Sequence, residues 1–187
     1  MRSSRVLVVD NGSLSIGAVR KTFLTLGADT DVIKAIDVPD KVDSRYQALV
    51  LSGTKVRAYD SAFYKPLIDL VFTSTVPVWG ICGGMQIIGT AAGAELVPGK
   101  SRTGTHQAQV DKREPVFSEV KPTVSVFQRH TLYLQAAPAG FRTIGWSDDA
   151  PVEFIRSEDG RIHGSQAHLE FRADGLDILR GFVQLFN

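Results

Sequence analysis

Cys82, the only cysteine in the chain, has the surroundings that most favour nucleophilic chemistry. It follows an apolar run at 78–81 and precedes a predicted helix. Small neighbours permit the sharp strand-to-helix turn that holds a nucleophile in a strained position at a strand tip, and Gly80, Gly83 and Gly84 supply them. The helix N-terminus would also favour the thiolate, the reactive form of cysteine. Most cytosolic cysteines are buried structural thiols, but the flanking glycines favour the nucleophile here.

His168 and Glu170 are the best candidates for the base and the carboxylate that a cysteine hydrolase requires. Both follow a predicted strand, and in an extended chain residues two apart point to the same side. His130 is an intermediate candidate, whereas His106 and His163 have only the features of surface or structural histidines. The histidines lack close paired spacing and no acidic cluster accompanies them, so we expect no metal site and no cofactor.

Length and composition narrow the class of protein. A chain of 187 residues with 43% hydrophobic and 22% charged residues predicts one globular domain spanning residues 1–187. The net charge of +1 is spread without long blocks, which argues against a nucleic-acid partner. The N-terminus has no apolar core of signal-peptide length, and no run approaches the roughly 20 apolar residues of a membrane span. We therefore expect a cytoplasmic protein without a membrane partner.

The first half of the chain alternates between strand and helix patterns. A continuous apolar run at 6–9 ends at Asp10-Asn11-Gly12, as a strand buried on both faces would. Further strands are predicted at 30–36, 48–51 and 76–81, and helices at 16–26 and 63–72. This order predicts an α/β fold with a doubly wound, mostly parallel sheet, a flavodoxin-like three-layer sandwich. Asn11, Ser52 and Cys82 should lie along the edge formed by the strand ends.

The pattern changes in the second half. From 105 to 164, short alternating runs separated by Pro and Gly predict an extension of mostly antiparallel strands. Apolar residues at helical spacing between 176 and 186 predict a closing amphipathic helix, with Asp174 as its cap. At the first predicted helix, Ser13 or Ser15 can cap the start and Gly27 marks the end.

The segment around the nucleophile resembles a known family. Gly-Ile-Cys-Gly-Gly-Met-Gln at 80–86 is similar to the Gly-x-Cys-x-Gly-x-Gln motif of class I glutamine amidotransferases. The resemblance extends over nearly the whole chain, through Val-Asp-Asn-Gly-Ser at 9–13 and Leu-Ser-Gly at 51–53. Among the branches of the family, the glutaminase part of GMP synthetase looks most similar, because its elbow reads Gly-Ile-Cys-x-Gly-Met-Gln.

The resemblance implies hydrolysis of the side-chain amide of glutamine. Cys82 would attack the amide, His168 would carry a proton to the departing ammonia, and Glu170 would orient His168. Water would then hydrolyse the glutamyl thioester. Gln86 and His130 are expected to bind the substrate.

An oxyanion hole is also implied, formed by the N–H of Gly83 and the backbone near Gly53 and Thr54. Three segments depart from the family's pattern. Ser52-Gly53-Thr54-Lys55 stands where Ser-Gly-Gly-Pro is usual, so a turn expected to need φ > 0 carries Thr54. Gln-Ala-His-Leu-Glu at 166–170 replaces Gln-Phe-His-Pro-Glu, and Gln-Arg-His-Thr at 128–131 keeps only the histidine of a Ser-His-Gly-Asp segment.

Three functions remain open at this point. A glutaminase without an attached synthase suggests a subunit whose ammonia passes to a partner synthase, such as a GMP synthetase. The altered segments at Thr54 and Arg129 instead allow a γ-glutamyl or other amide hydrolase that needs no partner. The changes at Ala167 and Leu169 allow a non-catalytic binding module, which the intact Cys82 disfavours.

Overall fold

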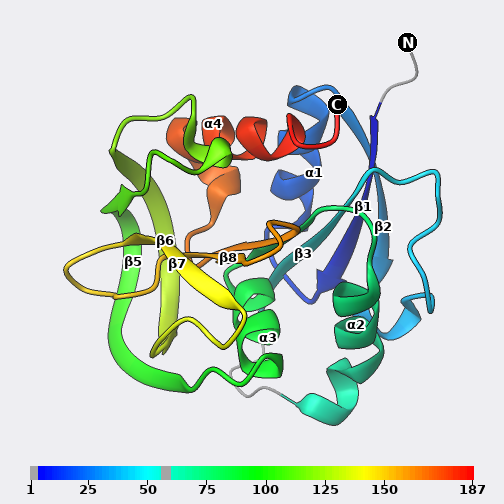
Figure 1. Ribbon diagram of the computed structural model, residues 1–187, viewed down its shortest axis with the longest axis horizontal. Coiled ribbons are helices and arrows are strands. Elements are labelled where there is room, and N and C mark those ends of the chain that lie inside the picture. The colour runs from blue at the N-terminus through cyan, green and yellow to red at the C-terminus, as the bar shows by residue number, and fades with distance from the viewer. Residues whose placement is uncertain (1–3, 56–59) are drawn as a thin grey trace.

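The computed structural model describes residues 4–55 and 60–187, which form an α/β fold built on one curled sheet of nine strands (Figure 1). The strands are β1 (Ser4–Asn11), β2 (Ala28–Lys34), β3 (Ala48–Thr54), β4 (Val78–Ile81), β5 (Leu96–Val110), β6 (Thr123–Leu134), β7 (Phe141–Trp146), β8 (Phe154–Ser157) and β9 (Ile162–Ser165). The helices of the described residues are α1 (Ile16–Thr25), α2 (Ser61–Thr73), α3 (Gly83–Ala91) and α4 (Ala173–Val183), with short 3₁₀ turns η1 (Ala35–Asp37), η2 (Pro115–Phe117) and η3 (Leu169–Phe171).

The sheet has a parallel half and an antiparallel half. Its strand order is β2-β1-β3-β4-β9-β8-β7-β5-β6. The five strands from β2 to β9 pair in parallel, and every pairing from β9 to β6 is antiparallel. The expected α/β class and antiparallel extension are therefore present, but a mostly parallel sheet describes only one half. The extension is larger than expected because β5 and β6 are long strands.

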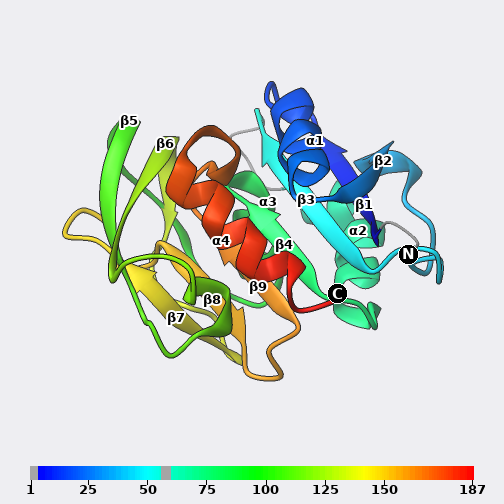
Figure 2. The same ribbon diagram turned by 90° about the horizontal axis from the view of Figure 1, so that it is seen from above.

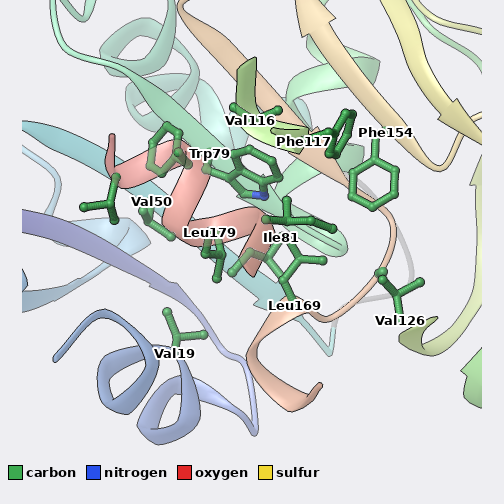
Figure 3. Close-up of a cluster of buried hydrophobic side chains, with 14 of the residues drawn as sticks. Val19, Val50, Trp79, Ile81, Val116, Phe117, Val126, Phe154, Leu169 and Leu179 are labelled. Carbon is green, nitrogen blue, oxygen red and sulfur yellow. The ribbon is translucent and has the colours of Figure 1, made fainter. Parts of the chain in front are cut away.

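Helices cover both faces of the parallel half. Val6 and Val8 of β1 pack in one apolar cluster with side chains of α1 and α4, whereas Leu7 and Val9 pack in another with α2 and α3. Figure 3 shows the first cluster, in which Trp79 of β4 is fully buried. Figures 1 and 2 show the same division, with α1 and α4 on the opposite side of the strands from α2 and α3. Strands buried on both faces account for the continuous apolar runs.

The predicted helix ends agree with the structure only in part. Gly27 follows α1 in a left-handed conformation, φ +82°, as predicted for its end. Ser15 is the N-cap residue of α1, but its side chain makes no capping hydrogen bond. Asp174 does not cap the closing helix, because α4 already begins at Ala173. The Asp174 carboxylate instead accepts a hydrogen bond from the N–H of Ser125 at 2.7 Å, which ties α4 to β6.

The antiparallel half begins earlier than predicted. β5 starts at Leu96, whereas alternation was expected only from 105. Its pairing with β6 shifts register between Pro98 and Arg102, so the segment that lacks an alternating pattern contains an irregularity. In the middle of the sheet, β8 pairs with β9 and β9 pairs with β4, which connects the antiparallel half to the parallel strands.

Within residues 4–55 and 60–187, no helix combines the length and the apolar character that a membrane span requires.

Candidate active site

Cys82 lies at a strained turn between β4 and α3. Its backbone angles are φ 49° and ψ −104°, and in the described part of the chain it alone combines a positive φ with a side chain. Such a conformation costs free energy and persists only where the surroundings hold it. Here the N–H of Cys82 donates to the carbonyl of Ser165 at 2.6 Å, which anchors the turn to the end of β9.

The glycines of this elbow are required by close packing. A Cβ at Gly80 would lie 2.7 Å from the Met85 nitrogen, and one at Gly84 would lie 2.6 Å from the Leu51 carbonyl oxygen. A Cβ at Gly83 would lie 2.4 Å from a side-chain carbon of Thr54. Distances below 3.0 Å leave no room for any side chain at these positions. The predicted elbow, with its strained cysteine and obligatory small neighbours, is confirmed.

His168 and Glu170 lie beside this elbow. Nδ1 of His168 is 2.9 Å from Oε1 of Glu170, and both side chains are almost completely buried. Gly53 lies between the imidazole of His168 and the side chain of Cys82. A Cβ at Gly53 would be 3.1 Å from Cε1 of His168 and 3.9 Å from Cβ of Cys82, so the two side chains are close neighbours. The structure thus brings together the sulfur, the imidazole and the carboxylate that the sequence singled out.

Electrostatics at this site favour a protonated imidazole. Burial alone would lower the pKa of His168, but hydrogen bonds to Cys82 and Glu170, with the negative charge of both, raise that pKa to about 10. The imidazole therefore carries a proton at neutral pH, next to a sulfur nucleophile. A cysteine paired with a protonated histidine is the arrangement that activates thiol nucleophiles and supplies an acid for a leaving amine.

Sequence reasoning missed Gln166 as a member of the site. Its side chain is fully buried, and its amide nitrogen lies 3.6 Å from Sγ of Cys82, within the hydrogen-bonding range of sulfur. The expected extended chain from His168 to Glu170 is wrong, because residues 166–167 form a bend and Glu170 lies in the 3₁₀ turn η3. The spacing in the sequence therefore carried no reliable signal for Gln166, which the fold brings to Cys82 from the end of β9.

A pocket of about 220 Å³ opens at Cys82. This volume is smaller than that of typical drug-sized sites, which start near 300 Å³, and suits a small metabolite. Besides Cys82, its lining residues are Thr54, Lys55, Gly83, Gln86, Ser101, Thr103, Arg129, His130, Thr131 and Leu132. Four residues expected at the substrate or the oxyanion hole, Thr54, Gly83, Gln86 and His130, therefore share one cavity wall with the nucleophile.

Gln86 uses its amide nitrogen within the protein. Its Nε2 donates to the Leu132 carbonyl at 2.9 Å and to Oε1 of Gln166 at 3.2 Å. The second bond orients the Gln166 amide so that its own nitrogen faces Cys82. Gln86 therefore both lines the pocket and sets the direction of the donor on the nucleophile, a role that its expected substrate contact did not include.

His130 belongs to a buried polar network behind the pocket. Its Nε2 lies 3.0 Å from Oε1 of Gln128, and Nε2 of Gln128 donates to Glu153 at 2.8 Å. Glu153 is completely buried and forms an ion pair with the equally buried Arg102. Burial, and then the charge of Arg102, lower the pKa of His130 to about 4. His130 is therefore a neutral wall of the pocket, unlike His168.

The structure shows how the chain accommodates the segments that depart from the family's pattern, at Thr54 and at Ala167 and Leu169. Thr54 does not have a positive φ, so the expected left-handed turn at this residue is wrong. β3 instead continues through Thr54, which keeps an extended conformation that any residue can adopt. Ala167 and Leu169 are both buried in the apolar cluster of Figure 3, so their changed side chains pack into the core.

His163 packs in the apolar core instead of joining Cys82 and His168. His163 of β9 is buried and stacks on Trp79, with ring centroids 5.4 Å apart. Burial, followed by the charge of Arg156, lowers its pKa to about 3. His163 is therefore a neutral structural histidine of the core, and its Nδ1 has no hydrogen-bond partner among the described residues. In that same part of the chain, no three His, Cys, Asp or Glu side chains are grouped to hold a metal ion.

Known proteins resemble this chain in sequence and in fold. The family model "Glutamine amidotransferase class-I" matches residues 7–183. Glutamine-hydrolysing GMP synthase of Thermus thermophilus is 32% identical over 186 residues, which cover 96% of this chain and 36% of that protein. The chain therefore spans about a third of the length of that relative.

Two further proteins match along most of their own length. A glutamine-hydrolysing GMP synthase subunit from Methanopyrus kandleri is 27% identical over 186 residues, 96% of this chain and 97% of the relative. A solved glutamine amidotransferase from Thermotoga maritima superposes with a TM-score of 0.77 at 20% identity, covering all of this chain and 83% of the other, and shows the same fold. Since the family model covers residues 7–183, from β1 to the end of α4, this chain belongs to the class I glutamine amidotransferases.

Proposed function

We propose that this chain hydrolyses the side-chain amide of glutamine through a thioester on Cys82 and supplies the ammonia to a separate synthase. The observation that supports this most is the grouping of His168 and Glu170 beside Cys82, which itself lines a small pocket. Membership of the amidotransferase family and the names of the relatives agree with it.

In the first half of the proposed reaction, the sulfur of Cys82 bonds to the side-chain carbonyl carbon of glutamine. The C–N bond of the tetrahedral intermediate then breaks, and the protonated His168 gives its proton to the nitrogen, which leaves as ammonia. Glu170 keeps Nδ1 of the imidazole in place, which directs the other ring nitrogen toward the reacting atoms.

In the second half, water attacks the thioester while the now neutral His168 accepts one of its protons. The C–S bond breaks, which releases glutamate and restores the sulfur with a protonated imidazole beside it. Both tetrahedral intermediates carry a negative oxygen. The N–H of Gly83 is suited to bind it, because the first N–H groups of a helix have no acceptor within that helix.

The proposed ammonia acceptor is a synthase of the kind named in the relatives, a GMP synthase. One relative is named as a subunit of that enzyme and matches this chain along 97% of its own length, so a separate synthase subunit would complete the assembly. With such a partner, we expect glutamine hydrolysis to be slow alone and to rise when the synthase and its substrates are added.

An assay of the purified chain tests the proposal. Glutamate and ammonia released from glutamine should be equal in amount, and Cys82→Ala should abolish both while preserving the fold, because loss of a small thiol leaves little cavity. A glutamine-like electrophile such as 6-diazo-5-oxo-norleucine should label the peptide that contains Cys82. Undiminished hydrolysis by Cys82→Ala would contradict the mechanism.

One feature of the pocket favours a second candidate substrate. Lys55 and Arg129 line the cavity, and no acidic side chain does so among the residues that the structure describes. This charge suits a γ-glutamyl peptide, whose extra carboxylate lies beyond the scissile amide. Comparing kcat/KM for glutamine and for γ-glutamyl-glycine separates the two candidates, and the synthase should stimulate only the hydrolysis of glutamine.

A further inference from the structure

We infer that Ser15 is a positioning residue for the carboxylate of Glu170, and that it forms the fourth link of a chain from Cys82 through His168. The inference rests on the proposed function for its activity readout. It assigns a role to a residue outside the motif segments at 80–86 and 166–170, and outside the substrate pocket.

The two donors to Glu170 converge on one oxygen. Oε1 of Glu170 accepts from Oγ of Ser15 at 2.6 Å and lies 2.9 Å from Nδ1 of His168. The Glu170 side chain is fully buried, and among the described residues its Oε2 has no hydrogen-bond partner. Among the residues that the structure describes, the hydroxyl of Ser15 is thus the one hydrogen-bond partner of this carboxylate besides the imidazole.

The hydroxyl of Ser15 bonds to Glu170 and does not cap helix α1. Serine at a helix N-cap normally accepts a hydrogen bond from an N–H of the first turn, yet Ser15 makes no such bond with α1. Its single hydroxyl proton points at Glu170. Ser15 is also 4% exposed, so water does not compete for that proton.

A second serine, Ser13, donates a hydrogen bond to the hydroxyl of Ser15. Oγ of Ser13 lies 2.9 Å from Oγ of Ser15, and it accepts the backbone N–H of Ser15 at 3.1 Å. Because Ser15 gives its proton to Glu170, Ser13 must be the donor between the two hydroxyls. A hydroxyl that accepts one hydrogen bond donates a stronger one. The loop after β1 therefore presents a polarised donor to the carboxylate.

Loss of this donor should affect the chemical step rather than substrate binding. Without it, the buried carboxylate is held only by the imidazole that it is meant to orient, and both can rotate together. Ser15 does not line the pocket, so the affinity for glutamine should be preserved. A hydrogen bond to a charged group accounts for roughly a tenfold effect on a rate or equilibrium.

Three variants test the role in glutamine hydrolysis by the purified chain. Ser15→Ala should lower kcat about tenfold with KM unchanged, since one hydrogen bond to a charged group is lost. Ser15→Thr, which keeps the hydroxyl, should restore most of kcat. Ser74→Ala is the matched control, because Ser74 is similarly buried at 6% exposure and its hydroxyl only bridges the turn at Val76. Equal losses of kcat in Ser15→Ala and Ser15→Thr would overturn the inference.

A double-mutant cycle shows whether Ser15 acts through Glu170. In the Glu170→Ala background no carboxylate remains to be held, so adding Ser15→Ala should lower kcat no further. A second, full tenfold loss in the double variant would mean that Ser15 acts elsewhere and would overturn the inference.

Alkylation of the thiol separates this inference from the proposed function. Iodoacetamide has a single thiol to modify, Cys82, and needs no glutamine chemistry. Ser15→Ala should slow alkylation at pH 7 severalfold relative to Ser74→Ala. If Ser15→Ala slows alkylation as expected but the wild-type chain hydrolyses no glutamine, the proposed function fails and the role of Ser15 stands. If it hydrolyses glutamine and Ser15→Ala changes neither rate, the role of Ser15 is refuted and the proposed function stands.

Discussion

The backbone of Gly83 meets that of Thr54 so closely that a Cβ at position 83 would lie 2.6 Å from the Thr54 nitrogen. Gly83 begins α3 and Thr54 ends β3, and both line the pocket beside Cys82. The end of β3 and the start of α3 thus meet at the proposed oxyanion hole. The spacing between them leaves no tolerance for a larger residue.

Gly83→Ala should therefore damage catalysis severely. The added methyl group must push α3 away from β3, which displaces the N–H groups proposed for the oxyanion hole. Losing one such donor costs about a hundredfold or more in kcat. Steady-state glutamine hydrolysis measures the loss. Gly17→Ala is the control and should keep normal activity, since a Cβ at Gly17 in α1 would have no heavy atom within 4 Å. Normal activity of Gly83→Ala would contradict the proposed oxyanion hole.

The strain at Cys82 should reverse the usual ranking of alanine and glycine. Alanine normally stabilises a position relative to glycine, but φ 49° and ψ −104° are costly for any residue with a Cβ. We expect Cys82→Gly to have a free energy of unfolding about 1 kcal/mol higher than that of Cys82→Ala. Urea denaturation of the two variants measures the difference. A Cys82→Ala variant as stable as Cys82→Gly would show that the turn is unstrained.

Glu170→Gln should lower the pKa of His168 below its value of about 10. The carboxylate is one of the two groups that outweigh burial and favour the imidazolium, and an uncharged amide does so less. NMR titration of the imidazole signals measures the change, with the buried His163 as an internal reference. Because the folded-state pKa is raised, the stability contributed by this proton is fully present below about pH 6.5 and is lost as the pH rises toward 10. An unshifted His168 titration would exclude the coupling.

His163 should make the fold sensitive to acid. Its pKa of about 3 lies below that of an unfolded histidine, so the unfolded chain binds a proton that the folded chain excludes. Stability is then complete above about pH 6.5 and falls as the pH drops toward 3, by at most about 1.4 kcal/mol per pH unit. His163→Phe, which keeps an aromatic ring against Trp79, should flatten this dependence between pH 7 and 5. Some acid sensitivity will remain in His163→Phe, because the pKa of His130 is also lowered, to about 4. If the free energy of unfolding of His163→Phe falls with pH as steeply as that of the wild-type chain, the prediction is contradicted.

Local patterns predicted the parts of the molecule that local sterics determine. Gly80, Gly83 and Gly84 identified the elbow, because a strand that turns sharply into a helix needs small residues next to the turn. The continuous apolar run at 6–9 identified a strand covered on both faces, since alternate residues of β1 enter different clusters.

Predictions failed where one residue type serves several purposes. Asp174 has the side chain of a helix cap, but it accepts the N–H of Ser125 on β6 instead. Thr54 occupies a position expected to turn with φ > 0, yet β3 extends through it. The segment from Leu96 to Gly104 lacks alternation because its pairing with β6 is irregular. In each case a contact with a distant segment outweighs the local preference.

The sequence by itself determined the elbow around Cys82, the proposed nucleophile, and the separation of His168 and Glu170 by two positions, because these depend on neighbouring residues along the chain. Only the tertiary structure decided which groups meet. β4 pairs with β9, with Ile81 opposite Ser165, so the residues that follow these two strands emerge at one edge of the sheet. The bonds of Gln166 to Cys82 and of Ser15 to Glu170 join segments distant in sequence, and such contacts follow from strand order, which side-chain periodicity does not encode.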